Sequence, residues 1–141
     1  MRVVIDTNVV VSAVINPNGT PARVLNAVLS GRLMLLYDER ILAEYRGVLL
    51  RPVFGFNRAD VDALLDFLEL SGMLLAGQEL PVDLPDATDL PFLEVAVAGQ
   101  ADALITGNIR HFRPRRGRRE VRIMSPAEFM RDLVRKEHAP G

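Results

Sequence analysis

The stretch that decides the fold is Val3-Val4-Ile5-Asp6-Thr7-Asn8, close to the start of the chain. Its first three residues form a short β-branched run, which is typical of a buried strand. Asp6 follows this run directly and is the only charged residue between Arg2 and Arg23. A carboxylate in such apolar surroundings is costly unless another group pairs with it. Asp6 therefore either caps the helix that follows or belongs to a functional site.

Similar short apolar runs recur along the chain and alternate with helical patterns. This alternation predicts βαβ units, and hence a three-layer α/β/α fold in which helices cover both faces of a central, mostly parallel sheet. We expect one domain over residues 1–141, with a disordered tail from about residue 136. The expected strands are 3–5, 33–37, 73–76, 103–105 and 121–124. Helices are expected after Asp6 and from Thr20, Asp38, Asn57, Phe92 and Ser125, the last with a capping box completed by Glu128.

Length and composition limit the possible classes of protein. The 141 residues suit one domain, and 49% hydrophobic and 25% charged residues are ordinary for a globular protein. The chain has no Cys, which excludes a disulfide scaffold, a thiolate zinc site and a cysteine nucleophile. No apolar run approaches the roughly 20 residues of a membrane span, and Asp6 interrupts the run that a signal peptide would need. We therefore expect a cytoplasmic protein with no membrane partner.

The formal net charge of −1 conceals an asymmetry along the chain. Residues 1–109 carry 7 Arg and 14 acidic residues, whereas residues 110–141 carry 10 Lys or Arg and 4 acidic residues. The positive excess is concentrated between Arg110 and Arg122. This segment is either a solvated basic loop or a patch that contacts nucleic-acid phosphates. The candidates for RNA binding are Arg110, Arg113, Arg115, Arg116, Arg118 and Arg119.

Further acids are candidates for a site with Asp6. Glu44 lies at the edge of the apolar stripe of its helix, from where it can reach a cleft beside the sheet. Asp89 stands near the start of the next-to-last helix, with Asp86 three residues before it and Glu94 five residues after it. Glu44 is otherwise an ordinary boundary residue, and Asp89 otherwise a helix cap. If these acids converge, a divalent cation such as Mg²⁺ would remove their mutual repulsion.

Polar residues also follow the expected strand at 103–105. Thr106, Asn108 and His111 come after this strand, and the carboxyl ends of parallel strands share one edge of the sheet with Asp6. An isolated histidine in a loop is usually a surface residue. His111 is therefore either a surface residue of this loop or a residue of the site.

Five motifs follow one another along the chain: Asp6-Thr7-Asn8 after a strand, Glu44 on a helix, Asp89 with Phe92-Leu93-Glu94, Thr106-Gly107-Asn108 with His111-Phe112, and Ser125-Pro126-Ala127-Glu128-Phe129. Their order and spacing resemble those of the PIN-domain family. Within that family, they are similar to the VapC-like toxin components of toxin–antitoxin systems. The resemblance extends from Arg2 to about Leu133.

This resemblance implies a PIN-like α/β/α fold and a metal-dependent ribonuclease. The acidic constellation of the family falls on Asp6, Glu44 and Asp89, which would be catalytic and would bind Mg²⁺ or Mn²⁺. Many members carry a further Asp after the fourth strand, and this chain has none there. The candidates for an additional ligand are Asp86, Glu94 and Asn108, and the candidates for supporting the site are Thr7, Asn8, Thr106 and His111.

The resulting hypothesis is hydrolysis of an RNA phosphodiester by metal-activated water, with the toxin of a toxin–antitoxin pair as the biological role. The implied partners are an RNA substrate, a cognate antitoxin and a second copy in a homodimer. Two alternatives remain: an RNA-processing nuclease of this fold without an antitoxin, and a non-catalytic nucleic-acid or protein-binding module. A phosphoryl-transfer enzyme with Asp6 as nucleophile ranks lower, because Asn8 stands where such enzymes typically have a second Asp.

Overall fold

The computed structural model describes residues 1–76, 79–112 and 121–138. Its strands are β1 (Arg2–Ile5), β2 (Met34–Tyr37), β3 (Met73–Leu74), β4 (Ala103–Ile105) and β5 (Ile123–Met124). They form one sheet in the order β3-β2-β1-β4-β5, and each neighbouring pair is parallel. The predicted α/β fold with a central parallel sheet is confirmed, although β3 and β5 are each two residues shorter than expected.

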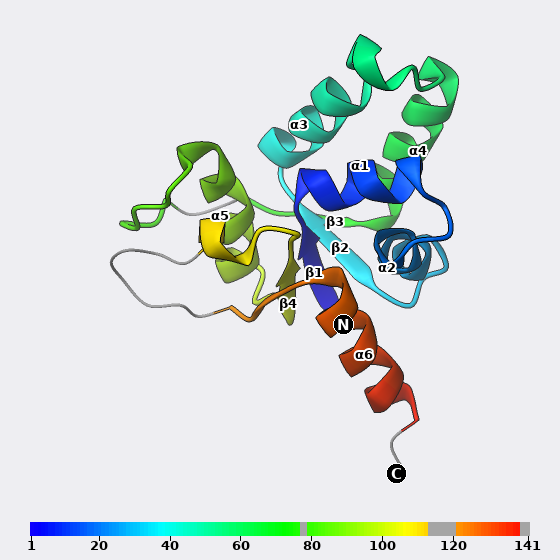
Figure 1. Cartoon of the computed structure of the whole chain (residues 1–141). Coiled ribbons are helices and arrows are strands. Elements are labelled where there is room, and N and C mark those ends of the chain that lie inside the picture. Colours follow the sequence, from blue (N-terminus) through cyan, green and yellow to red (C-terminus); the bar gives the residue numbers. More distant parts are fainter. Residues whose placement is uncertain (77–78, 113–120, 139–141) are drawn as a thin grey trace.

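Helices cover both faces of this sheet, as the alternating pattern predicts. Figure 1 shows α5 (Leu90–Ala98) on one side of the strands, and α1 (Thr7–Ile15), α2 (Thr20–Leu29) and α6 (Pro126–Glu137) on the other. The helices α3 (Glu39–Leu49) and α4 (Arg58–Ser71) form a pair at the top of this view. Short 3₁₀ turns are η1 (Pro52–Phe54), η2 (Ala87–Asp89) and η3 (Ile109–Phe112). None of the helices in the described ranges combines the length and apolar character that crossing a bilayer takes.

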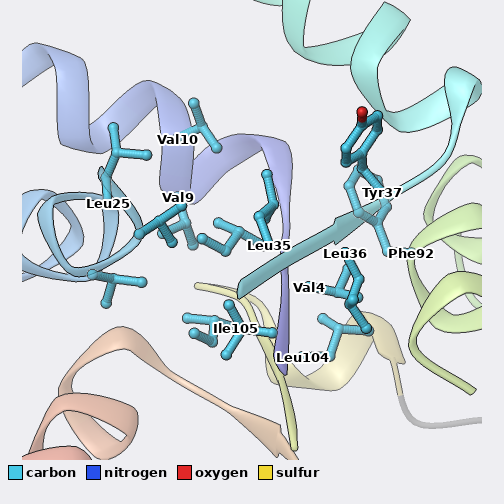
Figure 2. Packing of buried hydrophobic residues seen from close by; sticks show 14 of the residues in the cluster. Val4, Val9, Val10, Leu25, Leu35, Leu36, Tyr37, Phe92, Leu104 and Ile105 are labelled. Atoms are coloured by element: carbon cyan, nitrogen blue, oxygen red, sulfur yellow. The ribbon is translucent and has the colours of Figure 1, made fainter. Parts of the chain in front are cut away.

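The strands are apolar throughout because both faces of the sheet are buried. Successive side chains point to opposite faces, so Val4, Leu36 and Leu104 lie on the side of α5, whereas Leu35 and Ile105 lie on the side of α1 and α2 (Figure 2). All five side chains are at most 2% exposed. This double-sided core fixes the register of the strands and hence the position of whatever follows them.

Three of the predicted helix starts are confirmed by their caps. The side chain of Asp38 accepts a hydrogen bond from the N–H of Ile41 at 3.0 Å. Asn57 likewise caps α4, and Ser125 forms the reciprocal capping box with Glu128. The start of α2 differs, because Gly19 occupies the capping position and Thr20 is already helical. Pro21 then sits in the first turn, where its missing N–H is not needed.

The end of the chain differs from the expected tail. Helix α6 continues to Glu137, so Lys136 and Glu137 are helical. An ion pair holds this end of the helix, since Arg32 Nε donates to Glu137 Oε2 at 3.1 Å. Residues 139–141 lie outside the described part of the chain.

Candidate acidic site

The strand order creates a switch point between β1 and β4. From β1 the chain builds the sheet outward through β2 and β3, and it then returns to add β4 on the other side of β1. In open parallel sheets, ligands bind at the carboxyl ends of the two strands that flank such a point. Asp6 follows β1 and Thr106 follows β4, and the Thr106 hydroxyl donates to Asp6 Oδ2 at 2.8 Å. The structure therefore brings these two predicted site residues together.

The carboxylate of Asp6 is buried but does not act as a helix cap. Asp6 is 5% exposed and precedes α1, yet its side chain makes no capping hydrogen bond. Burial raises the pKa of the Asp6 carboxyl above its ordinary value of 3.8. The hydroxyl of Thr106, the N–H groups of Thr7 and Asn8, and the charge of His111 offset this rise only in part. Helix capping therefore does not explain why an acid stands here.

Glu44 reaches the same place from α3. Its half-buried carboxylate accepts a hydrogen bond from the hydroxyl of Thr7, the residue after Asp6. The next residue, Tyr45, is fully buried, and its hydroxyl donates to the backbone carbonyl of Ile5 at the end of β1. These two contacts attach α3 to the start of α1 and the end of β1, which explains how Glu44 comes beside the Asp6 segment.

Asp89 completes the group of three predicted carboxylates and has the most perturbed environment. It precedes α5 without capping it, and its buried Oδ2 has no hydrogen-bond partner among the described residues. Among the described residues, His111 Nδ1 lies 3.5 Å from this oxygen without the geometry of a hydrogen bond. Burial raises the pKa of Asp89 to about 6, and the negative charges of Asp6, Asp86 and Glu44 contribute to the rise. The charge of His111 acts in the opposite direction.

An aromatic row, defined here as Tyr45, Phe92 and Phe112, supports the site from the core. The ring centroids of Tyr45 and Phe92 are 6.4 Å apart, and those of Phe92 and Phe112 are 6.5 Å apart in an edge-to-face contact. Each ring is at most 1% exposed. Tyr45 directly follows Glu44, and Phe112 directly follows His111. No supporting role was predicted for these residues, although an aromatic residue directly after Glu44 and after His111 was a usable signal.

Glu94 lies in a separate ion pair and not among the other acids. It is 3% exposed, and its two oxygens accept hydrogen bonds from Arg40 Nη1 at 2.8 Å and from the N–H of Leu80 at 3.0 Å. Arg40 also pairs with Asp38 at 2.7 Å. Sequence analysis missed Arg40, because its partner Glu94 is 54 positions away and no local pattern joins them.

The remaining predicted residues are more exposed. Asp86 is engaged in a local turn, where it accepts hydrogen bonds from the N–H and hydroxyl of Thr88 that lower its pKa. Asn8 and Asn108 are exposed, and the N–H of Asn108 donates to Thr106 Oγ1 at 3.0 Å. Of the predicted RNA-binding residues, Arg110 is exposed on η3, and Arg113, Arg115, Arg116, Arg118 and Arg119 lie outside the described residues.

The chemistry of these carboxylates suits a hard cation, although the described part of the chain contains no preformed metal-binding group. Asp6, Glu44 and Asp89 offer carboxylate oxygens, and one oxygen of Asp89 is both buried and unpartnered within the described ranges. Among the described residues, no three acidic or histidine side chains are already arranged to hold a metal ion. The three carboxylates are nevertheless close enough for Asp6 and Glu44 to raise the pKa of Asp89. The donor set therefore fits Mg²⁺ or Mn²⁺, which would offset this accumulated negative charge.

The fold and the site together define an α/β protein with three neighbouring carboxylates, those of Asp6, Glu44 and Asp89, at the switch point of a parallel sheet. The family model of the PIN domain matches residues 2–110, so the chain belongs to the PIN-domain family, a family of nucleases. The chain is also 31% identical to the uncharacterized protein MJ1680 of Methanocaldococcus jannaschii over 112 residues, which are 77% of this chain and 71% of that protein. The resemblance to PIN domains inferred from the sequence is confirmed.

Two solved structures have a similar fold. VapBC2 from Rickettsia felis, bound to a DNA fragment from its promoter, matches with a TM-score of 0.58 and 17% identity over 89% of this chain and 98% of that chain. VapBC-1 from nontypeable Haemophilus influenzae matches with a TM-score of 0.54 and 16% identity over 90% of this chain and 99% of that chain. At this level of identity, the likeness concerns the fold.

Proposed function

We propose that this protein is a metal-dependent endoribonuclease that hydrolyses RNA phosphodiesters, with Asp6, Glu44 and Asp89 as its catalytic carboxylates. The observation that supports this most is the buried Oδ2 of Asp89, which has no hydrogen-bond donor among the described residues. Nearby negative charges help burial to raise the pKa of the same carboxyl to about 6. A buried, unpartnered carboxylate among other acids has no structural benefit and is typical of a functional site.

Mg²⁺ or Mn²⁺ is the cofactor in this proposal, held by Asp6, Glu44 and Asp89. Carboxylate ligands suit both ions. When bound, such an ion supplies an activated water and positive charge for the phosphate that is attacked. The three carboxylates by themselves repel RNA, so the ion also makes binding of a phosphate possible there.

The neighbouring polar residues orient the carboxylates. Thr106 holds Asp6 through its hydroxyl, and Thr7 holds Glu44 in the same way. Both hydroxyls belong to residues that are at most 4% exposed, so water does not compete for these hydrogen bonds. Asn8 is exposed beside Thr7 and is available to an RNA substrate in this proposal.

The test is RNA cleavage by Asp6→Asn and Asp89→Asn in Mg²⁺ and in EDTA. Each substitution keeps the size of the side chain and removes its charge. We expect each variant and the EDTA sample to lose roughly 100-fold or more in rate. Asp66→Asn is the matched control, because Asp66 is an exposed acid on α4, and it should retain full activity. Cleavage that survives both the substitutions and EDTA would contradict the proposal.

We also propose that the biological role is that of the toxin in a toxin–antitoxin pair, acting in the cytoplasm as a homodimer. The sequence resemblance to VapC-like toxins supports this role, and so does the similarity of the fold to VapBC2 and VapBC-1. Expression of the chain should arrest growth, and Asp6→Asn should not. Co-expression of a small protein encoded next to the gene should restore growth, and this small protein should co-purify with the chain. Growth that continues while the nuclease is active would contradict the toxin role and leave an RNA-processing nuclease.

A further inference from the structure

The pair formed by Asp89 and His111 has an unusual geometry. Asp89 Oδ2 and His111 Nδ1 are 3.5 Å apart, and no hydrogen bond joins them. A charge-assisted N–H···O bond would be shorter, at about 2.7–2.9 Å. Two neighbouring ligands of one octahedral ion at about 2.1 Å each are separated by roughly 3 Å. The observed separation is too long for such a hydrogen bond and exceeds the ligand–ligand separation by about half an ångström, so a small approach of the two side chains would let both atoms bind one ion.

The position of His111 is held by the structure around it. The N–H of His111 donates to the carbonyl of Asn108 at 3.0 Å, and the N–H of Asn108 donates to Thr106 Oγ1 at 3.0 Å. The same Thr106 hydroxyl donates to Asp6, so a continuous series of hydrogen bonds connects Asp6 with the backbone of His111. Phe112, the residue after His111, is fully buried and packs against Phe92. Phe92 in turn lies three residues after Asp89.

The extra ligands predicted from the sequence, Asp86, Glu94 and Asn108, are each hydrogen-bonded or exposed. Both oxygens of Glu94 accept hydrogen bonds, from Arg40 and from the N–H of Leu80. One oxygen of Asp86 accepts two hydrogen bonds from Thr88, and the side chain is exposed. His111 is also exposed, but its Nδ1 lies 3.5 Å from the oxygen of Asp89 that has no hydrogen-bond partner among the described residues.

We propose that His111 Nδ1 is a ligand of the same ion as Asp89, and that this nitrogen shifts the preference of the site from Mg²⁺ toward Mn²⁺. The inference rests on the proposed metal site. Carboxylates suit Mg²⁺ and Mn²⁺ alike, whereas imidazole nitrogen binds transition-metal ions in preference to Mg²⁺. A site made of carboxylates alone would lack this discrimination.

The test uses Mn²⁺ itself as the probe, in pulsed electron paramagnetic resonance that detects nitrogen bound to the ion. The chain has only two histidines, His111 and His138, and His138 is exposed at the end of α6. We expect a nitrogen coupling from the wild type and from the matched control His138→Ala, and no such coupling from His111→Ala. The wild type and His138→Ala both retain His111. A nitrogen coupling in both samples therefore assigns the bound nitrogen to His111, even if His111→Ala fails to fold.

Metal affinities provide the second measurement. Calorimetric titrations with Mg²⁺ and with Mn²⁺ should show that His111→Ala weakens Mn²⁺ binding about tenfold. The same substitution should weaken Mg²⁺ binding by a smaller factor. His111→Asp should move the ratio of the two affinities back toward Mg²⁺. If Mn²⁺ binds in a manner that Asp89→Asn abolishes but without nitrogen coupling, the role of His111 is refuted and the metal site stands. If Asp89→Asn leaves Mn²⁺ binding unchanged, both this inference and the proposed site are refuted.

Discussion

At the scale of single residues, the carboxyl of Asp89 links the site to stability. Its pKa of about 6 in the folded chain exceeds the ordinary value of 3.8, so the folded state binds this proton more tightly than the unfolded state does. The contribution of this carboxyl to the free energy of unfolding is therefore greatest below about pH 4, and it is lost as the pH rises through about 6. In EDTA, we expect Asp89→Asn to be more stable than the wild type at pH 7.5 by about 1–2 kcal/mol, after allowance for solvent screening.

Urea unfolding at pH 4 and pH 7.5 measures this difference. The gain from Asp89→Asn should vanish near pH 4, where both the wild-type carboxyl and the substituted amide are neutral. Asp66→Asn should show no comparable gain at either pH. A variant that is less stable than the wild type at pH 7.5 would mean that the Asp89 charge is already compensated in the folded chain.

The hydroxyl of Thr106 makes a second prediction at this scale. Thr106→Val keeps the shape of the side chain but removes the donor to Asp6 and the acceptor for the N–H of Asn108. We expect a loss of about 10- to 100-fold in RNA cleavage or in metal affinity, since groups that orient metal ligands typically contribute that much. Thr106→Ser retains the hydroxyl and should retain most of the activity. Full activity in the valine variant would show that Asp6 needs no such support.

At the scale of elements, the helix starts show what the sequence could and could not predict. Asp38 and Asp89 both stand directly before a helix, and Asp6 stands directly before α1, but only Asp38 caps its helix with the side chain. Residue type and position are the same in these three cases. The difference lies in neighbours from distant parts of the chain, such as Thr106 beside Asp6. Local pattern therefore predicted the elements, while the environment of the acids required the folded structure or the family resemblance.

The capping box of α6 gives a prediction at the element scale. The Ser125 side chain accepts from the N–H of Glu128, and the Glu128 side chain accepts from the N–H of Ser125. We expect Ser125→Ala to lower the free energy of unfolding by about 1 kcal/mol, measured in urea, and Ser125→Thr to preserve most of it. Nuclease activity per folded molecule should not change, since α6 packs against α2 and β4. A loss of activity without a loss of stability would place α6 in the site.

At the scale of the whole molecule, charge is divided along the chain. Asp6, Glu44 and Asp89 belong to the negative part, residues 1–109, and Arg110 begins the positive part. In the Asp6→Asn background, we expect Arg115→Glu with Arg116→Glu to weaken RNA binding at least about tenfold at low salt. The slope of the logarithm of the binding constant against the logarithm of the salt concentration should become shallower by about 0.7 for each lost phosphate contact. Fluorescence anisotropy with labelled RNA measures both quantities.

The control for this prediction changes the net charge by the same amount elsewhere. Arg51→Glu with Arg58→Glu replaces two exposed residues of the acidic part and should affect RNA binding much less. Equal effects of the two double variants would mean that only the total charge matters. The basic segment would then be a solvated loop.

The aromatic row has a consequence for genetics. Because Phe112 directly follows His111 and Tyr45 directly follows Glu44 in the chain, we expect a smaller side chain in this row to leave a cavity that disturbs the site before it unfolds the domain. Phe112→Leu is therefore suited to serve as a conditional allele, active in the cold and silent in warm culture. In the proposed toxin role, such an allele would let a strain grow with the gene in warm culture and would start growth arrest after a shift to the cold.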